Sequence, residues 1–322
     1  MFERDPLLFR LEENYTAAER MLSSPWWEPE FAGLFDPGFT VDLPFAPPGM
    51  DQHLGVGQLL PHKEWLCRTV SNWYVKDLKL YGPRDPFGDK YIAVRVAGGD
   101  TFWGGRPGKF ESRHTTLLTV KNGRITHMKE WSNPLAYLRA AGLGVPAFRQ
   151  VLDREHNPQP EPVTLESMGL DLSPEAACAR AENNVLSFIT LDSKAAGAKR
   201  VMSPGFRHAV WNAPPDMLEE YPPEDFAAFD AWVWKSITGF WAGHPDMIPY
   251  ATDDPHCYFL EAGGYGQVDW VGNNAPGGYG NRYIKYIELD DDGLLARWDE
   301  NLNPISKFNS INRSLPTFPY LY

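Results

Sequence analysis

The sequence is poor in cysteine and has no long hydrophobic run. Three cysteines among 322 residues are odd in number and widely spaced, which is typical of a reducing compartment rather than a disulfide framework. The opening stretch MFERDPLLFRLEEN carries acidic side chains throughout and lacks the unbroken apolar core of a signal peptide. No later segment approaches the length of a membrane span. We therefore expect a cytoplasmic protein without a membrane partner.

Basic side chains are also in deficit. The 30 Lys and Arg residues are outnumbered by 42 Asp and Glu residues, so the net charge is −12. A surface of this sign repels the phosphates of nucleic acids. We therefore expect no nucleic-acid partner.

Motifs for metals, nucleotides and covalent catalysis are missing as well. The eight histidines show no HxH or HExxH spacing and no metal-site spacing with cysteines or carboxylates. The glycine clusters GGDTFWGG (98–105) and GGYGQVDWVG (263–272) are not followed by Lys-Ser/Thr and a helix, as a phosphate-binding loop would be. We interpret them as bulges and loops at a pocket mouth. No GxSxG element is present. The sequence therefore predicts neither a metal nor a cofactor.

Aromatic residues, by contrast, are abundant. Twelve Trp, 14 Tyr and 18 Phe make up 14% of the chain. Such an excess either fills a large core or lines an apolar pocket, and composition leaves both open. If it lines a pocket, the expected partner is a small aromatic substrate.

The sequence contains an internal repeat. The segment DPGFTVDLPFAPPGM (36–50) returns as SPGFRHAVWNAPPDM (203–217), an offset of 167 residues. Four further segments recur in the same order at offsets of 169 or 170: 10–14 with 180–184, 81–86 with 250–255, 122–134 with 292–304, and 145–148 with 315–318. Chance does not produce this many matches in one order, so the chain is a tandem duplication.

A polar segment separates the two copies. Residues 153–172, DREHNPQPEPVTLESMGLDL, contain prolines and charges, as an exposed linker does. Ser173, Pro174 and Glu175 then have the pattern of an N-cap, a first-turn proline and a first-turn acid. We predict a first module over 1–152, a linker over 153–172 and a second module over 173–322.

Both copies have the same predicted elements. Periodicity predicts an opening helix, proline-rich loops and a second helix, followed by strands with a period of two. The helices are predicted at 9–23, 57–71, 174–191 and 224–242. The strands are predicted at 74–80, 90–97, 112–121, 124–132, 246–250, 257–261, 281–290 and 294–300, with a two-residue hairpin at Asn122-Gly123. The predicted fold class is α+β, with a curved antiparallel sheet wrapped by helices around a cone-shaped interior in each module.

One segment resembles a known family. KYIAVRVAGGDTFWGGRPGKFESRHTTLLTVKNGRITHMKEWSNPLAYLRAAGLGVPAF (90–148) is similar to the phenazine-biosynthesis A/B family of the nuclear-transport-factor-2-like (NTF2-like, SnoaL-like) superfamily. The similarity lies in a strand–turn–strand, then Glu-aromatic-x-Asn, then a helix and a Val-Pro tail. TDDPHCYFLEAGGYG, GGYGNRYIKYIEL and ENLNP carry it in the second copy. Most members are single modules that dimerise through their sheets, so the resemblance implies a pseudo-dimer within this one chain. Whether two chains form a homo-oligomer stays open.

Glu130 is the first candidate for catalysis. On a strand it shares a face with Met128 and Thr126. If that face is the interior, an apolar cavity is expected to raise the pKa of the carboxyl group and let it exchange a proton near neutral pH. The resemblance carries the family's acid–base glutamate onto Glu130, while a solvated strand-end glutamate is the alternative. Met128 and Trp103 are the expected substrate contacts beside it.

His62 is the second candidate. In the segment PHKEW it aligns with a helix histidine that the family uses to bind its substrate. A lone helix histidine is otherwise more often a surface residue. The second copy has FDAWVWKSIT here and no histidine, which favours chemistry in the first copy.

Two adjacent pairs lie on the penultimate strands, Arg113 with His114 and Arg282 with Tyr283. Alternation sends one side chain of each pair inward and does not say which. An inward Arg113 could bind a carboxylate or phenolate, or pair with Glu130, and an inward His114 could donate a proton. A solvent-facing salt bridge is the alternative. Arg282 and Tyr283 are the corresponding substrate contacts in the second copy.

Glu300 takes the place of Glu130 in the second copy, with Trp298 on its face as a further substrate contact. Duplicated modules are free to diverge, so Glu300 is a second catalytic candidate rather than a required one. His208, beside the repeated Pro-Gly-Phe, is a weaker candidate.

These features favour a cofactor-independent lyase that uses acid–base catalysis on a small hydrophobic aromatic substrate. Two-copy chains of this length also resemble the diarylpropane lyases of sphingomonad lignin-dimer catabolism. That resemblance implies deformylation of a diarylpropane-1,3-diol to a stilbene, with release of formaldehyde. Two alternatives stay open: a dehydratase, isomerase or condensing enzyme of secondary metabolism, as in phenazine assembly, and a non-catalytic module that binds a small molecule.

Overall fold

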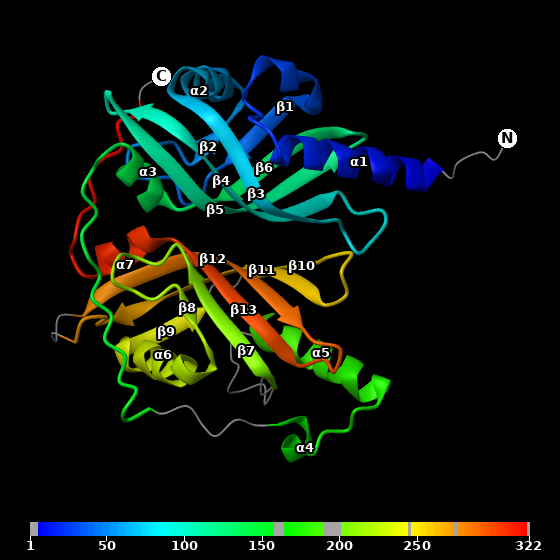
Figure 1. Cartoon of the computed structure of the whole chain (residues 1–322), viewed down its shortest axis with the longest axis vertical. Helices are drawn as coiled ribbons and strands as arrows, with labels where there is room; N and C mark the ends of the chain where they lie inside the picture. Colours follow the sequence, from blue (N-terminus) through cyan, green and yellow to red (C-terminus); the bar gives the residue numbers. More distant parts are fainter. Residues whose placement is uncertain (1–5, 158–163, 190–200, 244–245, 273–275, 321–322) are drawn as a thin grey trace. The chain divides into compact units, whose positions relative to one another are not determined.

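The computed structural model describes residues 6–157, 164–189, 201–243, 246–272 and 276–320 (Figure 1). The chain forms two compact units. The first contains Met1–Val145 together with Leu315–Tyr322, and the second contains Pro146–Ser314. The first unit therefore includes the end of the chain, whereas the sequence predicted modules over 1–152 and 173–322. None of the described helices is long and apolar enough to cross a membrane.

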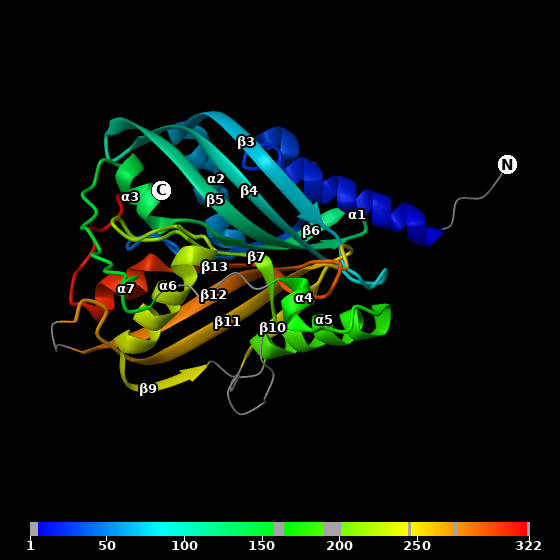
Figure 2. The ribbon, with the colours of Figure 1, turned by 60° about the horizontal axis from the view of Figure 1, so that its bottom comes forward.

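The first unit is a curved six-stranded sheet with helices packed against it (Figures 1 and 2). Its elements are α1 (Pro6–Leu22), η1 (Pro29–Leu34), β1 (Phe35–Asp42), β2 (His53–Leu54), α2 (Val56–Thr69), β3 (Val70–Tyr81), β4 (Lys90–Trp103), β5 (Arg106–Lys121), β6 (Arg124–Trp131) and α3 (Pro134–Ala140). The strand order is β2-β1-β6-β5-β4-β3.

The second unit repeats this order of elements. It contains α4 (Leu165–Met168), α5 (Pro174–Ile189), β7 (Met202–Trp211), β8 (Glu220–Tyr221), α6 (Pro223–Ser236), β9 (Ile237–Gly243), β10 (Ile248–Ala251), β11 (Cys257–Val268), β12 (Gly277–Leu289), β13 (Leu295–Leu302) and α7 (Pro304–Ser310). The strands are ordered β10-β11-β12-β13-β7-β8, and β9 also pairs with β11. The predicted fold class, two α+β modules with a curved sheet wrapped by helices, is confirmed.

Two details of the sheets differ from the prediction. The repeated Pro-Gly-Phe segment was expected to be a loop, but it forms β1 and β7, which pair in parallel with β6 and β13. Each sheet is therefore mixed rather than purely antiparallel. Phe39 and Val41 alternate into the core at 2% and 0% exposure, so burial outweighs the turn preference of the preceding proline and glycine. The helix predicted over 224–242 ends at Ser236, because β9 pairs with β11 from Ile237 onward.

The hairpin residues between β5 and β6 and the N-cap residues of α3 and α7 adopt the conformations that their residue types favour. Asn122 and Gly123 both have positive φ, as a two-residue hairpin between β5 and β6 requires. Asn133 caps α3 by accepting a hydrogen bond from the Leu135 backbone N–H, and proline follows it at the first helical position. Asn303 caps α7 in the same way. These caps fix α3 and α7 at equivalent places after the last strand of each unit.

The tails of the two repeats dock against equivalent loops. In the first unit the Phe318 N–H donates to the Pro48 carbonyl at 2.6 Å, and in the second the Phe148 N–H donates to the Pro215 carbonyl at 2.8 Å. Gly49 follows Pro48 with a φ of +97°, and a Cβ there would lie 2.8 Å from the Phe318 carbonyl oxygen. Only glycine permits so close an approach in this conformation. The segment Leu315–Tyr322, which follows the second repeat, is thus packed as part of the first unit.

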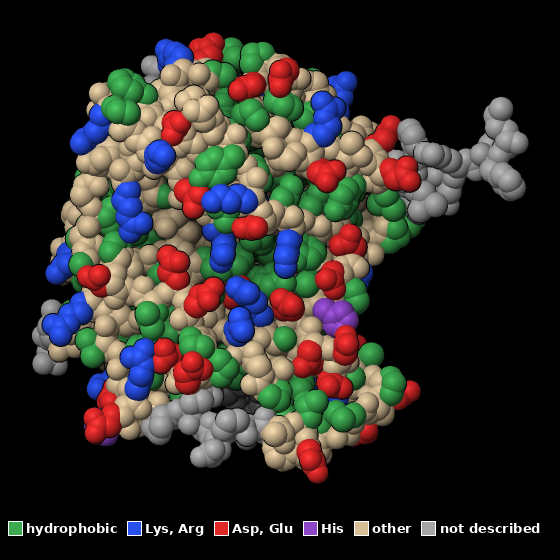
Figure 3. All heavy atoms as spheres, viewed as in Figure 1, with side chains coloured by type: hydrophobic (Ala, Val, Ile, Leu, Met, Phe, Trp, Pro, Cys, Tyr) green, Lys and Arg blue, Asp and Glu red, His purple; other side chains and the backbone are tan. Residues whose placement is uncertain are grey.

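Most charged side chains lie on the surface, as on the face shown in Figure 3, which makes the buried ones informative. Lys307 of α7 is 3% exposed in the second unit. Its Nζ lies 3.7 Å from the ring centroid of Trp270, with the rings of Trp232, Phe148 and Tyr279 at 5.3 to 5.8 Å. Burial lowers the pKa of Lys307 to about 7, although the charge of Glu300 opposes this shift. The rings attract the ammonium group and recover part of its lost hydration.

Replacing Lys307 with methionine is expected to stabilise the chain at pH 7. Above pH 7 the unfolded lysine still binds a proton that the buried amine has released, so the stability of the wild type rises with pH. The stability advantage of Lys307→Met should therefore shrink by about 3 kcal/mol between about pH 7 and 9.5. Chemical unfolding at several pH values measures this. Lys285→Met is the control and should instead destabilise, because it removes the ion-pair partner of Glu300. A constant difference between Lys307→Met and wild type across this range would contradict a lowered lysine pKa.

Candidate active site

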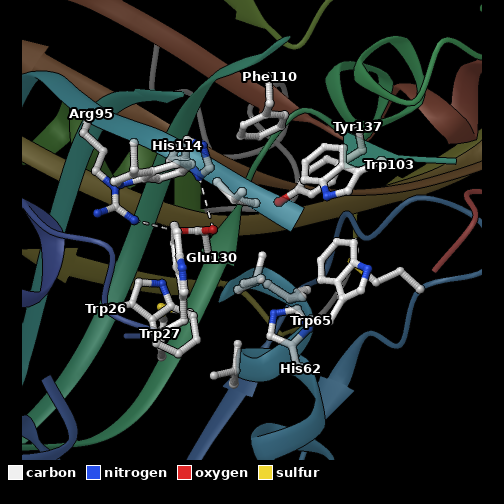
Figure 4. A pocket seen from close by; sticks show the side chains of 17 residues that line it. Trp26, Trp27, His62, Trp65, Arg95, Trp103, Phe110, His114, Glu130 and Tyr137 are labelled. Atoms are coloured by element: carbon white, nitrogen blue, oxygen red, sulfur yellow. Dashed lines mark hydrogen bonds and ion pairs between the residues drawn. The ribbon is translucent and has the colours of Figure 1, made fainter. Parts of the chain in front are cut away.

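A small cavity lies in the interior of the first unit (Figure 4). Its volume is about 50 Å³. Four of its lining residues are histidine, arginine or glutamate and come from one helix and three strands, namely His62, Arg95, His114 and Glu130. The rest of the lining is Trp26, Trp27, Val41, Leu43, Met50, Trp65, Leu66, Val70, Trp73, Trp103, Phe110, Met128 and Tyr137. The site therefore combines an aromatic wall with a compact polar group.

The register of three neighbouring strands brings the polar groups together. Arg95 of β4 is the direct partner of His114 of β5. Glu130 of β6 is the direct partner of Thr116, two residues along from His114. Directly paired residues, and residues two apart on one strand, share a face of the sheet. The side chains of Arg95, His114, Thr116 and Glu130 therefore point to the same side.

Glu130 is held by three neighbours, of which Arg95 and His114 are drawn in Figure 4. Arg95 Nη2 donates to Oε2 at 2.9 Å, and Thr116 Oγ1 donates to the same oxygen at 3.2 Å. His114 Nδ1 lies 3.1 Å from the other oxygen, Oε1. Arg95 is anchored in turn, because its Nη1 donates to the carbonyl of Leu22 at the end of α1. Both oxygens of Glu130 are thus engaged.

The charge state of Glu130 is the opposite of the predicted one. The prediction was that burial in an apolar cavity raises the carboxyl pKa toward neutrality. Burial does favour the neutral acid, but His114 and Arg95 outweigh it and lower the pKa of Glu130 to about 2. The sequence argument considered the apolar surroundings and did not include Arg95. Glu130 is therefore an ionised carboxylate throughout the physiological range.

His62 and Tyr137 are uncharged groups of the same cavity. Burial lowers the pKa of His62 to about 4, so its imidazole is neutral at pH 7. Its Nδ1 lies 2.6 Å from the hydroxyl of Tyr320. Burial and the nearby Glu130 raise the pKa of Tyr137, which keeps its phenol protonated. The Tyr137 ring stacks on Trp103 at a centroid distance of 5.5 Å.

The candidates of the first copy differ in whether they line the cavity. His62, Trp103, His114, Met128 and Glu130 all line the cavity. Arg113 does not, because strand alternation turns it to the opposite face of β5, where it is half-buried. The open choice between Arg113 and His114 is thus resolved in favour of His114.

Sequence reasoning missed Arg95, Tyr137 and most of the tryptophans in the wall. Arg95 had a signal, since it is the one charge within the apolar strand segment YIAVRVA. Charged residues are rarely buried unless they are paired, so an arginine in such a strand indicates a buried partner.

The second unit places different residues at the equivalent positions. Glu300 is the direct partner of Lys285, and its Oε1 lies 2.8 Å from Lys285 Nζ. Burial opposes ionisation of Glu300, but Lys285 and His208 outweigh it and lower its pKa. The position of Arg95 is taken by Ala262, which faces Tyr283 across the strands. The second unit therefore keeps the glutamate but has alanine and tyrosine at the positions of Arg95 and His114.

The remaining candidates of the second copy occupy different surroundings. Tyr283 is buried with its hydroxyl 3.0 Å from that of Tyr279, and Trp298 lies under Lys285. Arg282 is exposed on the opposite face of β12. His208 is buried, and its Nδ1 donates to the Trp298 carbonyl at 2.7 Å. A cavity of about 420 Å³ in this unit includes His208 but neither Glu300 nor Tyr283. In the described part of the chain, no group of three or more His, Cys, Asp or Glu side chains could hold a metal ion.

Comparison with known proteins gives partial matches. No protein-family model matches the chain. The phenazine biosynthesis protein PhzA1 of Pseudomonas aeruginosa is 30% identical over 89 residues, which cover 27% of this chain and 53% of that protein. PhzB2 of the same organism is 28% identical over 101 residues, which cover 31% of this chain and 55% of that protein.

Solved structures align with less than half of the chain. A phenazine biosynthesis-related protein from Pseudomonas aeruginosa has a TM-score of 0.40 at 17% identity, and the match covers 45% of this chain and 94% of that one. This chain spans about half the length of the curated phenazine proteins and is similar to them over that stretch.

Proposed function

We propose that the cavity of the first unit is the active site of an enzyme that moves protons on a small aromatic substrate without a bound cofactor. The observation that carries this proposal is the buried Glu130–His114 pair facing an aromatic-lined cavity. Residues with perturbed pKa values in an enclosed cavity are typical of catalytic groups.

His114 is the group that exchanges the proton in this proposal. Its Nδ1 faces the ionised Glu130, and its Nε2 is buried with no hydrogen-bond partner among the described residues. A carboxylate on one side of an imidazole fixes its orientation and stabilises the protonated ring. His114 can then accept a proton at Nε2 and return it, while Glu130 stays ionised.

The charge balance of the site favours an uncharged substrate. The charge of Arg95 is compensated by Glu130, and its Nη1 is bound by the Leu22 carbonyl. Arg95 is the one Lys or Arg among the described residues that line the cavity, so a substrate carboxylate would find no uncompensated cation there. His62 and Tyr137 offer neutral hydrogen-bonding groups that suit phenol or alcohol oxygens.

Deformylation of a diarylpropane-1,3-diol is the reaction that we propose. Removal of the proton from the terminal hydroxyl lets the bond between the central and terminal carbons break, which releases formaldehyde. The bonding electrons form the stilbene double bond, and the hydroxyl on the benzylic carbon leaves as water after it receives a proton. One proton is taken and one is returned, so no oxidant or reductant is required. A two-ring substrate is larger than the cavity, so side chains of the wall must move apart to admit it.

A dehydratase or isomerase of secondary metabolism is the second candidate. It is favoured by the 30% identity to PhzA1 over 89 residues. Such reactions also need only an acid and a base, and a small ketone would fit the same site. A purely binding module was expected to show exposed glutamates with unshifted pKa values. Glu130 is instead 7% exposed with a lowered pKa, which disfavours that alternative.

Glu130→Gln is expected to reduce turnover by roughly 100- to 10,000-fold. The substitution removes the negative charge that orients the His114 ring and stabilises its protonated form. The assay follows formaldehyde and stilbene absorbance with an aromatic dimer bearing a 1,3-diol side chain, and small cyclic ketones form the second panel. Glu300→Gln is the matched control, since it occupies the equivalent strand position but does not line the cavity. It should keep kcat/KM within about twofold. Equal losses in both variants, with unchanged melting temperatures, would rule out a site confined to the first unit.

The pH dependence of kcat/KM identifies the proton-exchanging group. Glu130 loses its charge only as the pH falls toward about 2, and His62 gains one only toward about 4. Neither changes charge between about pH 5 and 9. With an uncharged substrate, most of kcat/KM is therefore expected to be lost in His114→Gln at every pH in that range, and most of it is expected to be kept in His62→Gln. The reverse pattern would assign the proton transfer to His62.

A further inference from the structure

The last described residues of the chain pack against residues that line the cavity. Phe318 is 1% exposed, and its ring lies edge-on to Trp103 at 5.4 Å and to Tyr137 at 5.9 Å. Tyr320 lies edge-on to Trp65 at 4.9 Å. Trp65, Trp103 and Tyr137 all line the cavity, so this tail supports the rings that a substrate would touch.

Tyr320 also contacts a polar group of the site directly. Its hydroxyl lies 2.6 Å from Nδ1 of His62. A neutral imidazole has one N–H and one lone pair, and a partner on one nitrogen decides which nitrogen carries the proton. A phenol hydroxyl that donates to Nδ1 leaves the proton on Nε2, for which the described residues provide no partner. His62 then offers an N–H donor to the cavity it lines.

Comparison with the second unit shows which features of this tail are common to both units and which are specific to the first. Its tail docks with Phe148 in the position of Phe318. Gln150 stands where Tyr320 stands, and its side chain binds the Tyr221 hydroxyl and the Leu218 N–H. Phe229 of α6 occupies the helix position of His62. Tail docking is thus common to both units, whereas the tyrosine–histidine pair occurs only beside the Glu130–His114 pair.

We propose that Tyr320 is a positioning residue of the active site, which fixes the tautomer of His62 so that Nε2–H binds a substrate oxygen. This inference rests on the proposed function of the cavity. Tyr320, at the end of the second repeat, would then have a role in the site of the first repeat in addition to packing against the aromatic rings that line it.

Tyr320→Phe tests this role, because it keeps the ring and removes only the hydroxyl. We expect kcat/KM on the diol substrate to fall about tenfold, the effect of one lost neutral hydrogen bond. The loss should vanish in the His62→Gln background, since Tyr320 acts through His62. Gln150→Leu is the matched control in the second unit. It should leave kcat/KM unchanged even where it lowers the melting temperature.

A second measurement does not depend on turnover. Histidine ¹⁵N spectra, with His62 assigned from the His62→Gln variant, report which ring nitrogen carries the proton. In the wild type Nε2 should carry it, and in Tyr320→Phe the signal should shift toward a mixture of tautomers. An unchanged His62 signal, or a changed signal with unchanged kcat/KM, would overturn the inference while leaving Glu130→Gln as a separate test of the proposed function. If no substrate is turned over at all, the proposed function fails, and the spectrum alone decides whether Tyr320 fixes His62.

Discussion

The site depends on the compensation of one buried negative charge. An ionised carboxylate without partners would cost several kcal/mol in the interior, and Glu130 is 7% exposed. Arg95 and Thr116 bind one of its oxygens, and His114 lies beside the other. His114 and Thr116 lie on β5, which pairs with β6, and Arg95 lies on β4, which pairs with β5. The register of these two pairings therefore determines which groups surround the carboxylate. A shift of one residue in either pairing would turn these side chains to the other face.

The two repeats show that this compensation can be achieved in different ways on one backbone. In the second unit Ala262 replaces the arginine, and the required positive charge comes from Lys285 at the position of Thr116. Lys307 takes the helix position that Tyr137 has in the first unit and brings a second amine into the interior, among aromatic rings. The carboxylate is retained, and His208, which together with Lys285 lowers its pKa, lines a cavity that does not include Glu300.

The sequence predicted the fold better than the site because the two depend on different information. The duplication, the hairpin at Asn122-Gly123 and the capped helices are encoded by local patterns, and these recur at constant offsets. Strand alternation placed Glu130 on one face with Met128 and Thr126 but did not show that this face is the interior. Its ionisation could not be predicted, because the pKa depends on Arg95, which is 35 residues away along the chain and two strands away in the sheet. Alternation shows that Arg113 and His114 point to opposite faces of β5, but it does not show which face is turned toward the interior.

The tails limit how far the two modules can be regarded as separate domains. The prediction of modules over 1–152 and 173–322 assigns the whole of each repeat to its own unit. The first unit instead includes Leu315–Tyr322, and the hydroxyl of Tyr320 is 2.6 Å from His62. A protein cut at the predicted linker would keep Glu130, His114 and Arg95 but would lack Phe318 and Tyr320, which pack against residues of the cavity wall. Because the tail belongs to the same chain, its local concentration is high, and a separate chain would have to bind tightly to replace it. The second repeat therefore has a physical reason to stay attached.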